Sequence, residues 1–360
     1  MNRKHTAPTQ LRMNRRRFLA GSAAVGLSFH IPKELLAANG KVNFYNWDTY
    51  IGETTIEDFE DATGIEVQYD LFADNDELFA KLRGGNPGYD VIVPTNDYVE
   101  RMVVAEMLMP LDHSKIPNIV NLEEQFLDTE FDPGRKYSLP YMWGTIGIGY
   151  RKSAVETPPT SWNDILASDQ YAGRIALLSE PSTVMGMALK AMGKSLNDWS
   201  PENIAAAEKM LIDQKPNIVA FAPDNGQDLL LAGEVDFAME WNGDILQVMT
   251  EDDDIGYVVP EEGALLWEDC LCIPKDAPNV DSAYALIDFL LSAEAGAGIA
   301  DYVSYATPNK AAKELMSAEY LENPAVFPSE EALSKCEPMT YPGQKVSRQI
   351  DEAWTRIKAG

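Results

Sequence analysis

The chain is poor in the residues on which several kinds of catalysis depend. It has three histidines among 360 residues, and two of them lie in the first 38, so only His113 remains beyond that point. A single histidine excludes a multi-histidine metal site and leaves a histidine-based catalytic triad untenable. The G-x-S-x-G, P-loop and H-E-x-x-H motifs are absent as well. We therefore expect a protein without catalytic residues, bound metal or cofactor.

Cysteine is scarce too, and three cysteines permit at most one internal disulfide. Cys270 and Cys272 lie two residues apart in the string DCLCIP, on one side of a predicted strand. A bridge from Cys336 to either of them is allowed by the count but has no support in the sequence. We interpret all three cysteines as structural.

Long apolar runs are missing except at residues 18–29, and that run is shorter than the roughly 20 residues that a membrane-spanning helix needs. It follows the string NRRRFLAG, which resembles a twin-arginine export signal, and it precedes small residues at Ala37 and Ala38. An ordinary secretory signal is the alternative. Under both interpretations residues 1–38 direct export and take no part in the fold.

Basic residues are few once this segment is set aside. Residues 1–38 hold seven of the 29 Lys and Arg residues but one of the 57 Asp and Glu residues, which leaves 22 basic against 56 acidic side chains and a net charge of −34. Such a surface repels phosphate backbones and anionic lipids, which argues against nucleic acid or membrane surfaces as partners. Cationic small ligands would be attracted. Charge alone does not separate this role from a simple contribution to solubility.

Strand-like and helix-like runs alternate along the rest of the chain, which predicts an α/β protein with parallel strands covered by helices. The predicted strands lie at residues 41–46, 65–72, 89–94, 137–150, 173–181, 217–222 and 235–242, with two more in 254–274. The predicted helices lie at residues 56–63, 76–83, 98–106, 183–192, 201–213 and 282–291, before a helical C-terminal tail. No flexible linker separates the two α/β stretches. We therefore expect two lobes, joined by strands that cross between them, with a ligand cleft in the middle.

An aromatic residue followed closely by a carboxylate recurs where strands are predicted to end. The pattern comprises Trp47 with Asp48 and Tyr50, Trp241 with Asp244, and Trp267 with Glu268 and Asp269. Glu180, in the string LSEPST, follows another predicted strand. Open α/β folds place their ligand sites at such junctions.

The combination of an aromatic face and an acid suits an organic amine. An aromatic ring attracts a cation by roughly 0.5–2 kcal/mol. A buried ammonium without a partner would cost far more, so a carboxylate must stand beside the ring. At each single position the alternative is a packing tryptophan or a helix-capping aspartate. Three such pairs in an acidic chain that is poor in histidine favour the functional interpretation.

These residues also carry a resemblance to a known family. The strings FYNWDTYI, YDVIVPTNDYVER, LPYMWGTIGIGY, WNGD, LLWEDCLCIP and YATPNKAA resemble, in order and spacing, the spermidine and putrescine receptors of bacterial ABC importers. The likeness runs from Lys41 to Gly360. It implies a two-lobed type II periplasmic binding protein fold with its ligand cleft between the lobes. Lobe 1 would comprise residues 41–144 and 268–312, and lobe 2 residues 145–267 and 313–360.

The resemblance also implies roles for individual residues. The aromatic walls would be Trp47, Trp241 and Trp267; the acids facing the amines would be Glu180, Asp244 and Asp269; and Tyr50, Thr95 and Tyr305 would line the cleft with hydroxyl groups. Asp48, which stands one place before the family's usual acid position, is predicted from the aromatic and acid pattern to add a further negative charge. Gln344 would match a polar contact near the C-terminus. Thr49 and Thr183 stand where the family usually has acids, so the identity of the amine stays open.

The expected function is that of a monomeric periplasmic receptor. It would capture a linear di- or polyamine of the putrescine and spermidine type by hinge closure and deliver it to the permease of an ABC importer. Three alternatives stay open: a receptor of the same fold for another cationic amine or a sugar, a sensory receptor outside transport, and an exported enzyme.

Overall fold

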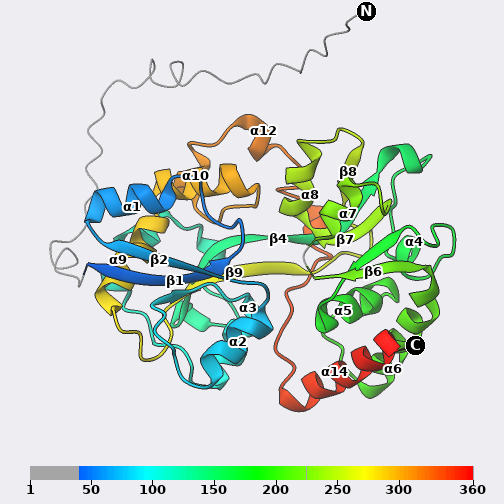
Figure 1. The fold of residues 1–360 in the computed structure, drawn as a ribbon, viewed down its shortest axis with the longest axis horizontal. Helices are drawn as coiled ribbons and strands as arrows, with labels where there is room; N and C mark the ends of the chain where they lie inside the picture. Colours follow the sequence, from blue (N-terminus) through cyan, green and yellow to red (C-terminus); the bar gives the residue numbers. More distant parts are fainter. Residues whose placement is uncertain (1–39, 224, 360) are drawn as a thin grey trace, which may run out of the picture.

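The structure is a computed structural model that describes residues 40–223 and 225–359. Figure 1 shows two α/β lobes side by side, with the long strand β4 (Ser138–Arg151) passing from one lobe into the other and β9 (Leu266–Cys272) alongside it. The export signal predicted at residues 1–38 lies outside the described residues.

Nine strands form one continuous sheet in the described part of the chain, in the order β2-β1-β3-β9-β4-β7-β5-β6, with β8 paired to β4. The remaining strands are β1 (Lys41–Trp47), β2 (Glu66–Phe72), β3 (Val91–Ile92), β5 (Ile175–Leu178), β6 (Ile218–Ala222), β7 (Phe237–Trp241) and β8 (Ile255–Val258). β1 runs parallel to β2 and β3, and β5 runs parallel to β6 and β7. The carboxyl ends of β1 and β7 are therefore the places where ligand-binding loops are expected.

The strand β4 joins the two lobes by changing partners along its length. Residues 138–145 pair antiparallel with β9, whereas residues 146–151 pair with β7 and β8. Three glycines in this strand permit close packing. An added Cβ at Gly144 would lie 2.5 Å from the Trp267 ring, and one at Gly147 would lie 2.4 Å from the Tyr257 ring. The string GTIGIG is thus required by packing at the crossing.

Helices cover both faces of each half of the sheet (Figure 1). They are α1 (Thr55–Thr63), α2 (Asn75–Arg83), α3 (Asn96–Val104), α4 (Asn163–Leu166), α5 (Pro181–Ala191), α6 (Pro201–Gln214), α7 (Gly226–Leu231), α8 (Asn242–Met249), α9 (Val280–Leu290), α10 (Ala293–Val303), α11 (Lys310–Lys313), α12 (Ala318–Leu321), α13 (Glu330–Leu333) and α14 (Gln344–Ala359). Local sequence explains their ends. The side chain of Asp74 caps α2 by accepting from the backbone N–H of Glu77, and α1 ends at Gly64 with φ 74°.

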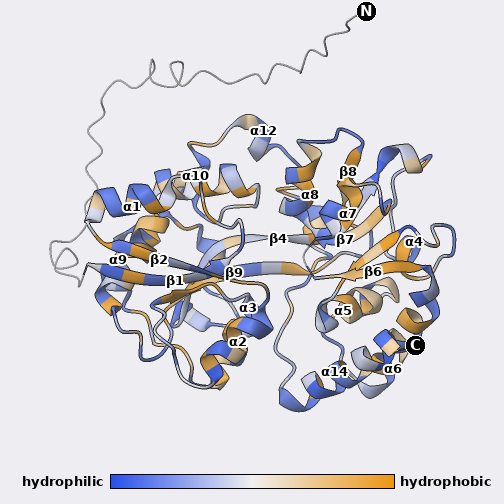
Figure 2. Ribbon diagram, viewed as in Figure 1, coloured by the Kyte–Doolittle hydropathy of each residue, from blue (hydrophilic) through white to orange (hydrophobic). Residues whose placement is uncertain are grey.

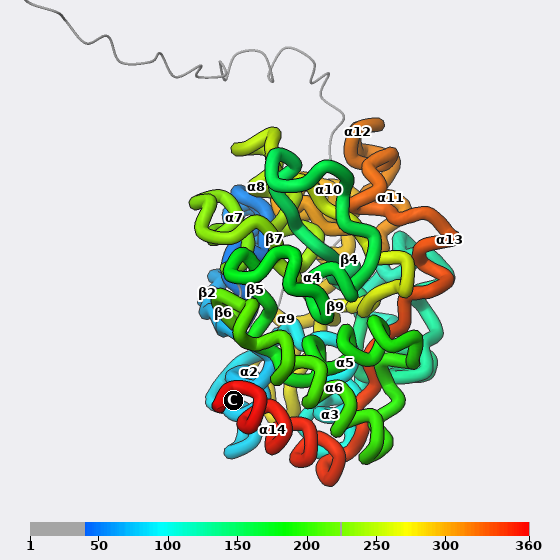
Figure 3. Tube along the Cα trace, turned by 90° about the vertical axis from the view of Figure 1, so that its right-hand side faces the viewer, coloured from blue at the N-terminus to red at the C-terminus, as the bar shows by residue number. Residues whose placement is uncertain are grey.

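The hydrophobic core follows the sheet through both lobes. Its buried apolar side chains come from strands and helices of both halves of the sheet, and Figure 2 shows hydrophobic segments most clearly along β6 and β7. In α14 the buried residues Ile350, Ala353, Trp354 and Ile357 recur at helical spacing and pack against α5 and α6 (Figure 3). Within the described residues no single helix has the length and apolar character of a membrane span, although the bent pair α9 and α10 reaches that threshold together.

The predicted elements are largely confirmed, with differences in the connections. Residues 113–135 contain four short 3-10 helices where no regular structure was predicted, namely His113–Lys115, Pro117–Asn121, Glu124–Phe126 and Pro133–Arg135. All three cysteines are free thiols, and Cys270 and Cys272 are buried in β9.

Candidate functional site

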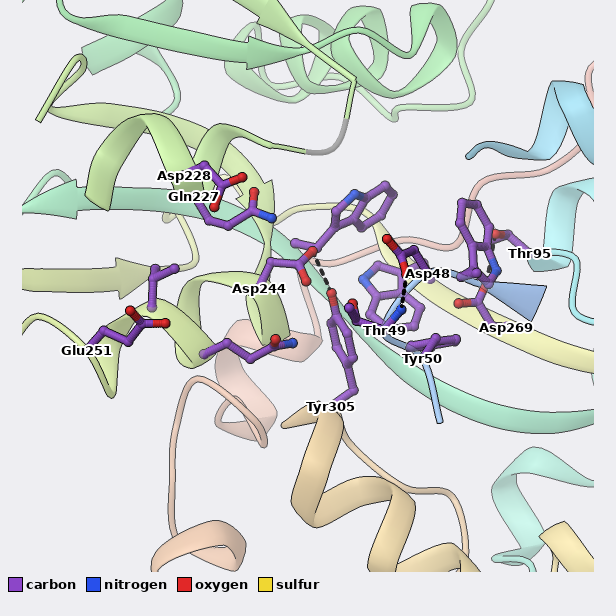
Figure 4. Close-up of a pocket in the computed structure, with 15 residues that line it drawn as sticks. Asp48, Thr49, Tyr50, Thr95, Gln227, Asp228, Asp244, Glu251, Asp269 and Tyr305 are labelled. Atoms are coloured by element: carbon purple, nitrogen blue, oxygen red, sulfur yellow. Dashed lines mark hydrogen bonds between the residues drawn. The ribbon is translucent and has the colours of Figure 1, made fainter. Parts of the chain in front are cut away.

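A cavity of about 360 Å³ lies where the lobes meet (Figure 4). Fifteen residues line it: Trp47, Asp48, Thr49, Tyr50, Thr95, Gln227, Asp228, Trp241, Asp244, Gln247, Val248, Glu251, Trp267, Asp269 and Tyr305. They come from the end of β1 and the loop after it, the start of α3, helix α7, the end of β7, helix α8 and the turn after it, strand β9 and the segment after α10. Segments far apart in the sequence therefore build one site.

The loop after β1 supplies the first of these groups. Trp47 is the last residue of β1, and its indole N–H donates to the Val93 carbonyl at 2.9 Å. Its ring packs against Phe72, with ring centroids 4.6 Å apart. Asp48 is exposed at the cavity rim, where it accepts from the backbone N–H of Thr49 at 2.9 Å. The strand end thus fixes the indole and leaves the adjacent carboxylate open to solvent.

Asp269 forms the deepest acidic point of the cavity. The Thr95 hydroxyl donates to Asp269 Oδ1 at 2.7 Å, and the same hydroxyl accepts from Asn75 Nδ2 at 2.8 Å. Thr95 occupies the N-cap position of α3, yet its side chain does not cap that helix. Its hydroxyl is committed to Asp269 instead, so the beginning of α3 and the strand β9 are tied together at the site.

Burial raises the pKa of Asp269 to about 7, with Thr95 and Tyr50 acting in the opposite direction and the negative charge of Glu268 adding to the rise. The Tyr50 hydroxyl faces Asp269, although no hydrogen bond of normal geometry joins the two. No Lys, Arg or His forms a salt bridge with Asp269 within the described residues. A cation entering the cavity would favour the ionised form of this carboxylate.

Asp244 marks the other side of the cavity. It lies in the first turn of α8, directly after the carboxyl end of β7, and accepts from the Tyr305 hydroxyl at 2.8 Å. Tyr305 approaches α8 this closely because Gly243 has no side chain, since a Cβ there would lie 2.5 Å from the tyrosine ring. The glycine in the string WNGD therefore allows Tyr305 to hold the Asp244 carboxylate in place.

Aromatic rings form a connected wall between the two acids. Trp267 packs edge to face against Trp241 and Tyr305, at centroid distances of 5.9 and 5.0 Å, and Tyr305 packs in the same manner against Tyr50 at 5.5 Å. Trp267 is only 3% exposed. The rings support one another in fixed orientations and leave an apolar surface between carboxylates.

The charged side chains among the described residues that line the cavity are all acidic. Five of its lining side chains are carboxylates, namely Asp48, Asp228, Asp244, Glu251 and Asp269, and no lysine, arginine or histidine is among the described residues that line it. Within residues 40–223 and 225–359, no group of three or more His, Cys, Asp or Glu side chains is arranged to hold a metal ion. The site can therefore neutralise a cation and cover its apolar parts.

The structure brings nine of the eleven residues predicted to contact the ligand together in this cavity. One exception is Gln344, the first residue of α14, which does not line it. The other is Glu180, which lines a second hollow of about 160 Å³ on the far side of Thr95 and Trp241, the two residues that both spaces share. Glu180 is the N-cap residue of α5 and accepts from the Thr183 hydroxyl at 3.0 Å. It belongs to the same interlobe region without contributing to the main cavity.

One expectation about local structure was wrong. Trp267, Glu268 and Asp269 do not follow a strand but lie inside β9, near its beginning. Trp267 and Asp269 reach the cavity because β9 pairs with β4 at the crossing between the lobes, and the cavity lies over that crossing, whereas Glu268 does not line it. A strand interior can line a cleft when the sheet itself continues from one lobe to the other.

Sequence reasoning missed a group of polar residues on α7 and α8. Gln227 and Asp228 lie on α7, Gln247 lies on α8, and Glu251 follows α8. None of them has an aromatic neighbour in the sequence. The pattern of an aromatic residue followed closely by a carboxylate therefore could not identify them as site residues. Only the packing of α7 beside α8 turns these side chains toward the cavity.

Known proteins resemble the chain over most of its length. A family model for bacterial extracellular solute-binding proteins matches residues 54–328. A spermidine/putrescine-binding periplasmic protein of Salmonella typhimurium is 35% identical over 343 residues, which cover 95% of this chain and 97% of that protein. The putrescine-binding periplasmic protein PotF of Escherichia coli is 33% identical, with 96% and 98% of the two chains covered.

The fold has close counterparts among solved structures. A spermidine/putrescine ABC transporter protein from Listeria monocytogenes, described as putative, superposes with a TM-score of 0.85 at 34% identity, covering 89% of this chain and 99% of that chain. The two-lobed α/β fold of type II periplasmic binding proteins, expected from the sequence, is thereby confirmed.

Proposed function

Because the chain belongs to the family of bacterial extracellular solute-binding proteins, we propose that its cleft captures a linear di- or polyamine of the putrescine and spermidine type. The observation that supports this most strongly is the charge of the cavity, which has five carboxylates, three indole rings and no basic side chain among its described lining residues. A neutral ligand would leave that charge uncompensated, and an anion would be repelled.

The ligand would exchange its water for protein contacts of two kinds. Its ammonium groups would pair with Asp244, Asp269 and Asp48 in the main cavity, and with Glu180 when the amine reaches the second hollow. Its methylene groups would lie against the indoles, where each buried methylene contributes about 0.8 kcal/mol. The spacing of charges along the apolar chain then decides which amine fits.

Capture would proceed by closure of the lobes. We place lobe 1 at residues 41–144 and 268–312 and lobe 2 at residues 145–267 and 313–360. Asp269 and Tyr50 then face the ligand from lobe 1, and Trp241 and Asp244 face it from lobe 2. A ligand that touches both lobes binds the closed form more tightly than the open form, and it shifts the population by that difference in affinity.

In the cell the protein would act in the periplasm, as a monomer and without catalysis, and would pass its ligand to the permease of an ABC importer. Nucleic acid is not a partner in this proposal, since the excess of acidic over basic side chains opposes it. Neighbouring genes for permease and ATPase subunits would support delivery to a transporter. A neighbouring sensor kinase would instead favour a sensory receptor.

A thermal-shift screen tests the proposal directly. Putrescine, cadaverine, agmatine, spermidine, amino acids and neutral sugars are added separately to the mature protein. A ligand that binds only the native state raises the melting temperature. We expect a rise with one or more of the amines, and titration calorimetry should then show an affinity that falls with salt, because the binding is electrostatic. A rise with a sugar alone, insensitive to salt, would contradict the proposal.

A further inference from the structure

The backbone places Thr95 and Asp269 side by side. The two residues form an isolated antiparallel bridge, and the backbone N–H of Cys270 donates to the Pro94 carbonyl at 2.9 Å. The Thr95 hydroxyl donates to Asp269 Oδ1 at 2.7 Å (Figure 4). Backbone pairing brings the hydroxyl within reach of the carboxylate, but it does not decide where the single hydrogen of the hydroxyl points, because that hydrogen rotates about the C–O bond.

Asn75, the first residue of α2, contacts Thr95 at two points. Its Oδ1 accepts from the backbone N–H of Thr95 at 3.2 Å, and its Nδ2 donates to the Thr95 hydroxyl at 2.8 Å. The first contact determines which end of the amide is the donor, because a flipped amide would set two donors against each other. Nδ2 therefore faces the hydroxyl oxygen and donates to it. The single hydrogen of the hydroxyl is then left for Asp269.

The start of α3 does not compete for the Thr95 hydroxyl. A threonine at an N-cap position usually accepts from a backbone N–H in the first turn of its helix. Thr95 makes no such bond, although it is the N-cap residue of α3. The Asp97 carboxylate instead accepts from the backbone N–H groups of Asp97 and Tyr98 in that turn. The hydroxyl oxygen of Thr95 thus remains available to Asn75, and its hydrogen to Asp269.

Asn75 reaches the main cavity only through Thr95. It is 8% exposed and lines the second hollow, not the main cavity. Within the described residues, both hydrogen bonds of its side chain go to Thr95. The helices α2 and α3 are also joined elsewhere, since the Tyr98 hydroxyl donates to Asp76 Oδ1 at 2.8 Å. The placement of the two helices therefore does not depend on Asn75 alone.

We propose that Asn75 is a positioning residue for the ligand site, which holds the Thr95 hydroxyl with its hydrogen directed at Asp269. This inference rests on the proposed function. The oriented hydroxyl fixes the Asp269 carboxylate in one orientation and favours its ionised form, which is the form that pairs with an ammonium group. An amide outside the cavity would thereby contribute to the affinity for the amine.

Several other titratable groups surround Asp269. Glu268 precedes it on β9, Asp97 lies on α3, Tyr50 follows β1, and Tyr141 lies on β4. All of them are kept when Asn75 is replaced. A difference in the titration of Asp269 between an Asn75 variant and the wild-type protein therefore reports on the Thr95 hydroxyl.

The test is a double-mutant cycle of Asn75→Ala and Thr95→Val, with Tyr98→Phe as a matched control that removes the other hydrogen bond between α2 and α3. The pKa of Asp269 in the ligand-free proteins is measured by NMR of isotope-labelled aspartate carboxyl groups, with Asp269→Asn used to assign the signal. We expect Asn75→Ala to raise the pKa of Asp269, because the ionised carboxylate loses an oriented donor. The same change should raise it little further in the Thr95→Val background, and Tyr98→Phe should leave it unchanged.

Putrescine binding, followed by titration calorimetry, gives the second measurement. We expect Asn75→Ala to weaken binding by about three- to tenfold at about pH 7. The loss should be smaller at about pH 8, where Asp269 is largely ionised in both proteins. In the Thr95→Val background, Asn75→Ala should change the affinity by less than about twofold, because the hydroxyl through which it acts is gone. Tyr98→Phe should also change it by less than about twofold.

Three results would overturn the inference. They are an unchanged pKa of Asp269 in Asn75→Ala, a loss of affinity that is the same at both pH values, and additive losses in the double variant. Each would mean that Asn75 only maintains the packing of α2.

Asn75→Asp replaces Asn75→Ala if the latter does not fold, because it keeps the size of the side chain and the acceptor for the Thr95 N–H but lacks the amide hydrogens. Its added charge raises the pKa of Asp269 in both backgrounds. The rise must be larger with Thr95 present than in the Thr95→Val background, and equal rises would overturn the inference. If the wild-type protein binds no amine although the pKa of Asp269 responds as expected, the proposed function is wrong, and a role of Asn75 in amine binding is overturned with it.

Discussion

The two faces of strand β9 treat adjacent carboxylates in opposite ways. Glu268 points away from the cavity, where Oε1 lies 2.7 Å and Oε2 2.9 Å from the guanidinium nitrogens of Arg135. Asp269 points into the cavity and receives only the Thr95 hydroxyl, with no basic side chain paired to it in the described chain. Successive residues of a strand face opposite sides, so an offset of one residue separates a structural ion pair from an acid that lines the cavity.

Under the proposed function, this difference leaves one carboxylate of β9 for an external cation. A buried carboxylate is costly unless it is paired. The chain meets that requirement for Glu268 with its own arginine, whose side chain is 1% exposed. Asp269 has no such partner among the described residues, and its raised pKa reflects the cost of burying an unpaired carboxylate. Under the proposed function, an incoming ammonium would relieve that cost and so contribute to the binding free energy.

The largest expected effect comes from breaking the internal pair. Arg135→Met leaves Glu268 buried without a cation, and removing one partner of such a pair costs about 3–5 kcal/mol of unfolding free energy. Urea denaturation followed by circular dichroism measures it. A loss of unfolding free energy below about 1 kcal/mol is typical of an exposed ion pair. Such a result would contradict the contrast between the two faces of β9.

Replacing the other acid should affect binding instead of folding. Asp269→Asn keeps the size of the side chain and removes its charge, so amine affinity should fall by at least about tenfold, or about 1.4 kcal/mol. The ligand-free protein should be at least as stable as the wild type near neutral pH. Calorimetry and thermal melting of the same preparation check both parts. Unchanged affinity would remove Asp269 from the site.

The pH dependence of amine binding gives a further test of the difference between Asp269 and Glu268. Because the pKa of Asp269 is about 7 in the ligand-free protein and the bound cation favours the carboxylate, affinity should fall as pH drops below about 7, by up to about tenfold per pH unit. The stability of the ligand-free protein has the opposite pH dependence. The raised pKa stabilises the fold at low pH, and this contribution is lost as pH rises from about 4 through about 7.

Other groups titrate in this range, Asp97 among them. The prediction therefore concerns the difference between the wild-type protein and Asp269→Asn, measured at several pH values. The variant should show a shallower pH dependence of affinity and a smaller loss of stability toward pH 7. Parallel pH profiles for the two proteins would mean that Asp269 does not titrate in the site.

Replacing Trp267, the indole of β9 near Asp269, should weaken amine binding less than Asp269→Asn does. Trp267 is buried, so Trp267→Ala would leave a cavity and destabilise the fold as well as the site. Trp267→Phe retains an aromatic face and should weaken amine binding by about three- to tenfold, because the indole is the better cation–π partner. The Trp143→Phe variant serves as a control, since Trp143 is also buried but does not line the cavity. Equal losses of affinity in both variants would indicate a general effect on packing.

The smallest effect on amine affinity is expected from replacing Asp48 at the rim of the cavity. Asp48 is exposed, so solvent and salt screen its charge, and Asp48→Asn should reduce affinity by less than about threefold. The reduction should shrink further at high salt, where the effect of Asp269→Asn should persist in part. Titrations at two salt concentrations measure this. A loss as large as that of Asp269→Asn would mean that closure buries Asp48 against the ligand.

Much of the fold could be predicted because it is encoded locally. The helix α2 begins where the Asp74 side chain accepts from the backbone N–H of Glu77 and the Glu77 carboxylate accepts from the backbone N–H of Ala73. The helix α14 is indicated by the spacing of its apolar residues. The short 3-10 helices between α3 and β4 escaped prediction because no repeating pattern marks them. Their backbone groups are held by distant partners, as when the backbone N–H of Asn118 donates to Asp288 at 2.7 Å.

The candidate site was predicted in part for the same reason. Aromatic and acidic residues that are close in sequence, such as Trp241 and Asp244, could be paired by inspection. Residues without that signature could not, and Asp228 and Glu251 reach the cavity only through the packing of α7 and α8. The position of Trp267 inside β9 likewise depends on the pairing of that strand with β4.

By itself, the sequence determined the chemistry available to this protein: an excess of acids, a near absence of histidine, and indoles placed beside carboxylates. Only the tertiary structure decided which acids are neutralised within the chain and which stay open to a ligand. Arg135 contacts Glu268 from 133 residues away, and no basic side chain among the described residues pairs with Asp269. Such a choice depends on how distant segments pack together, and no local propensity records it.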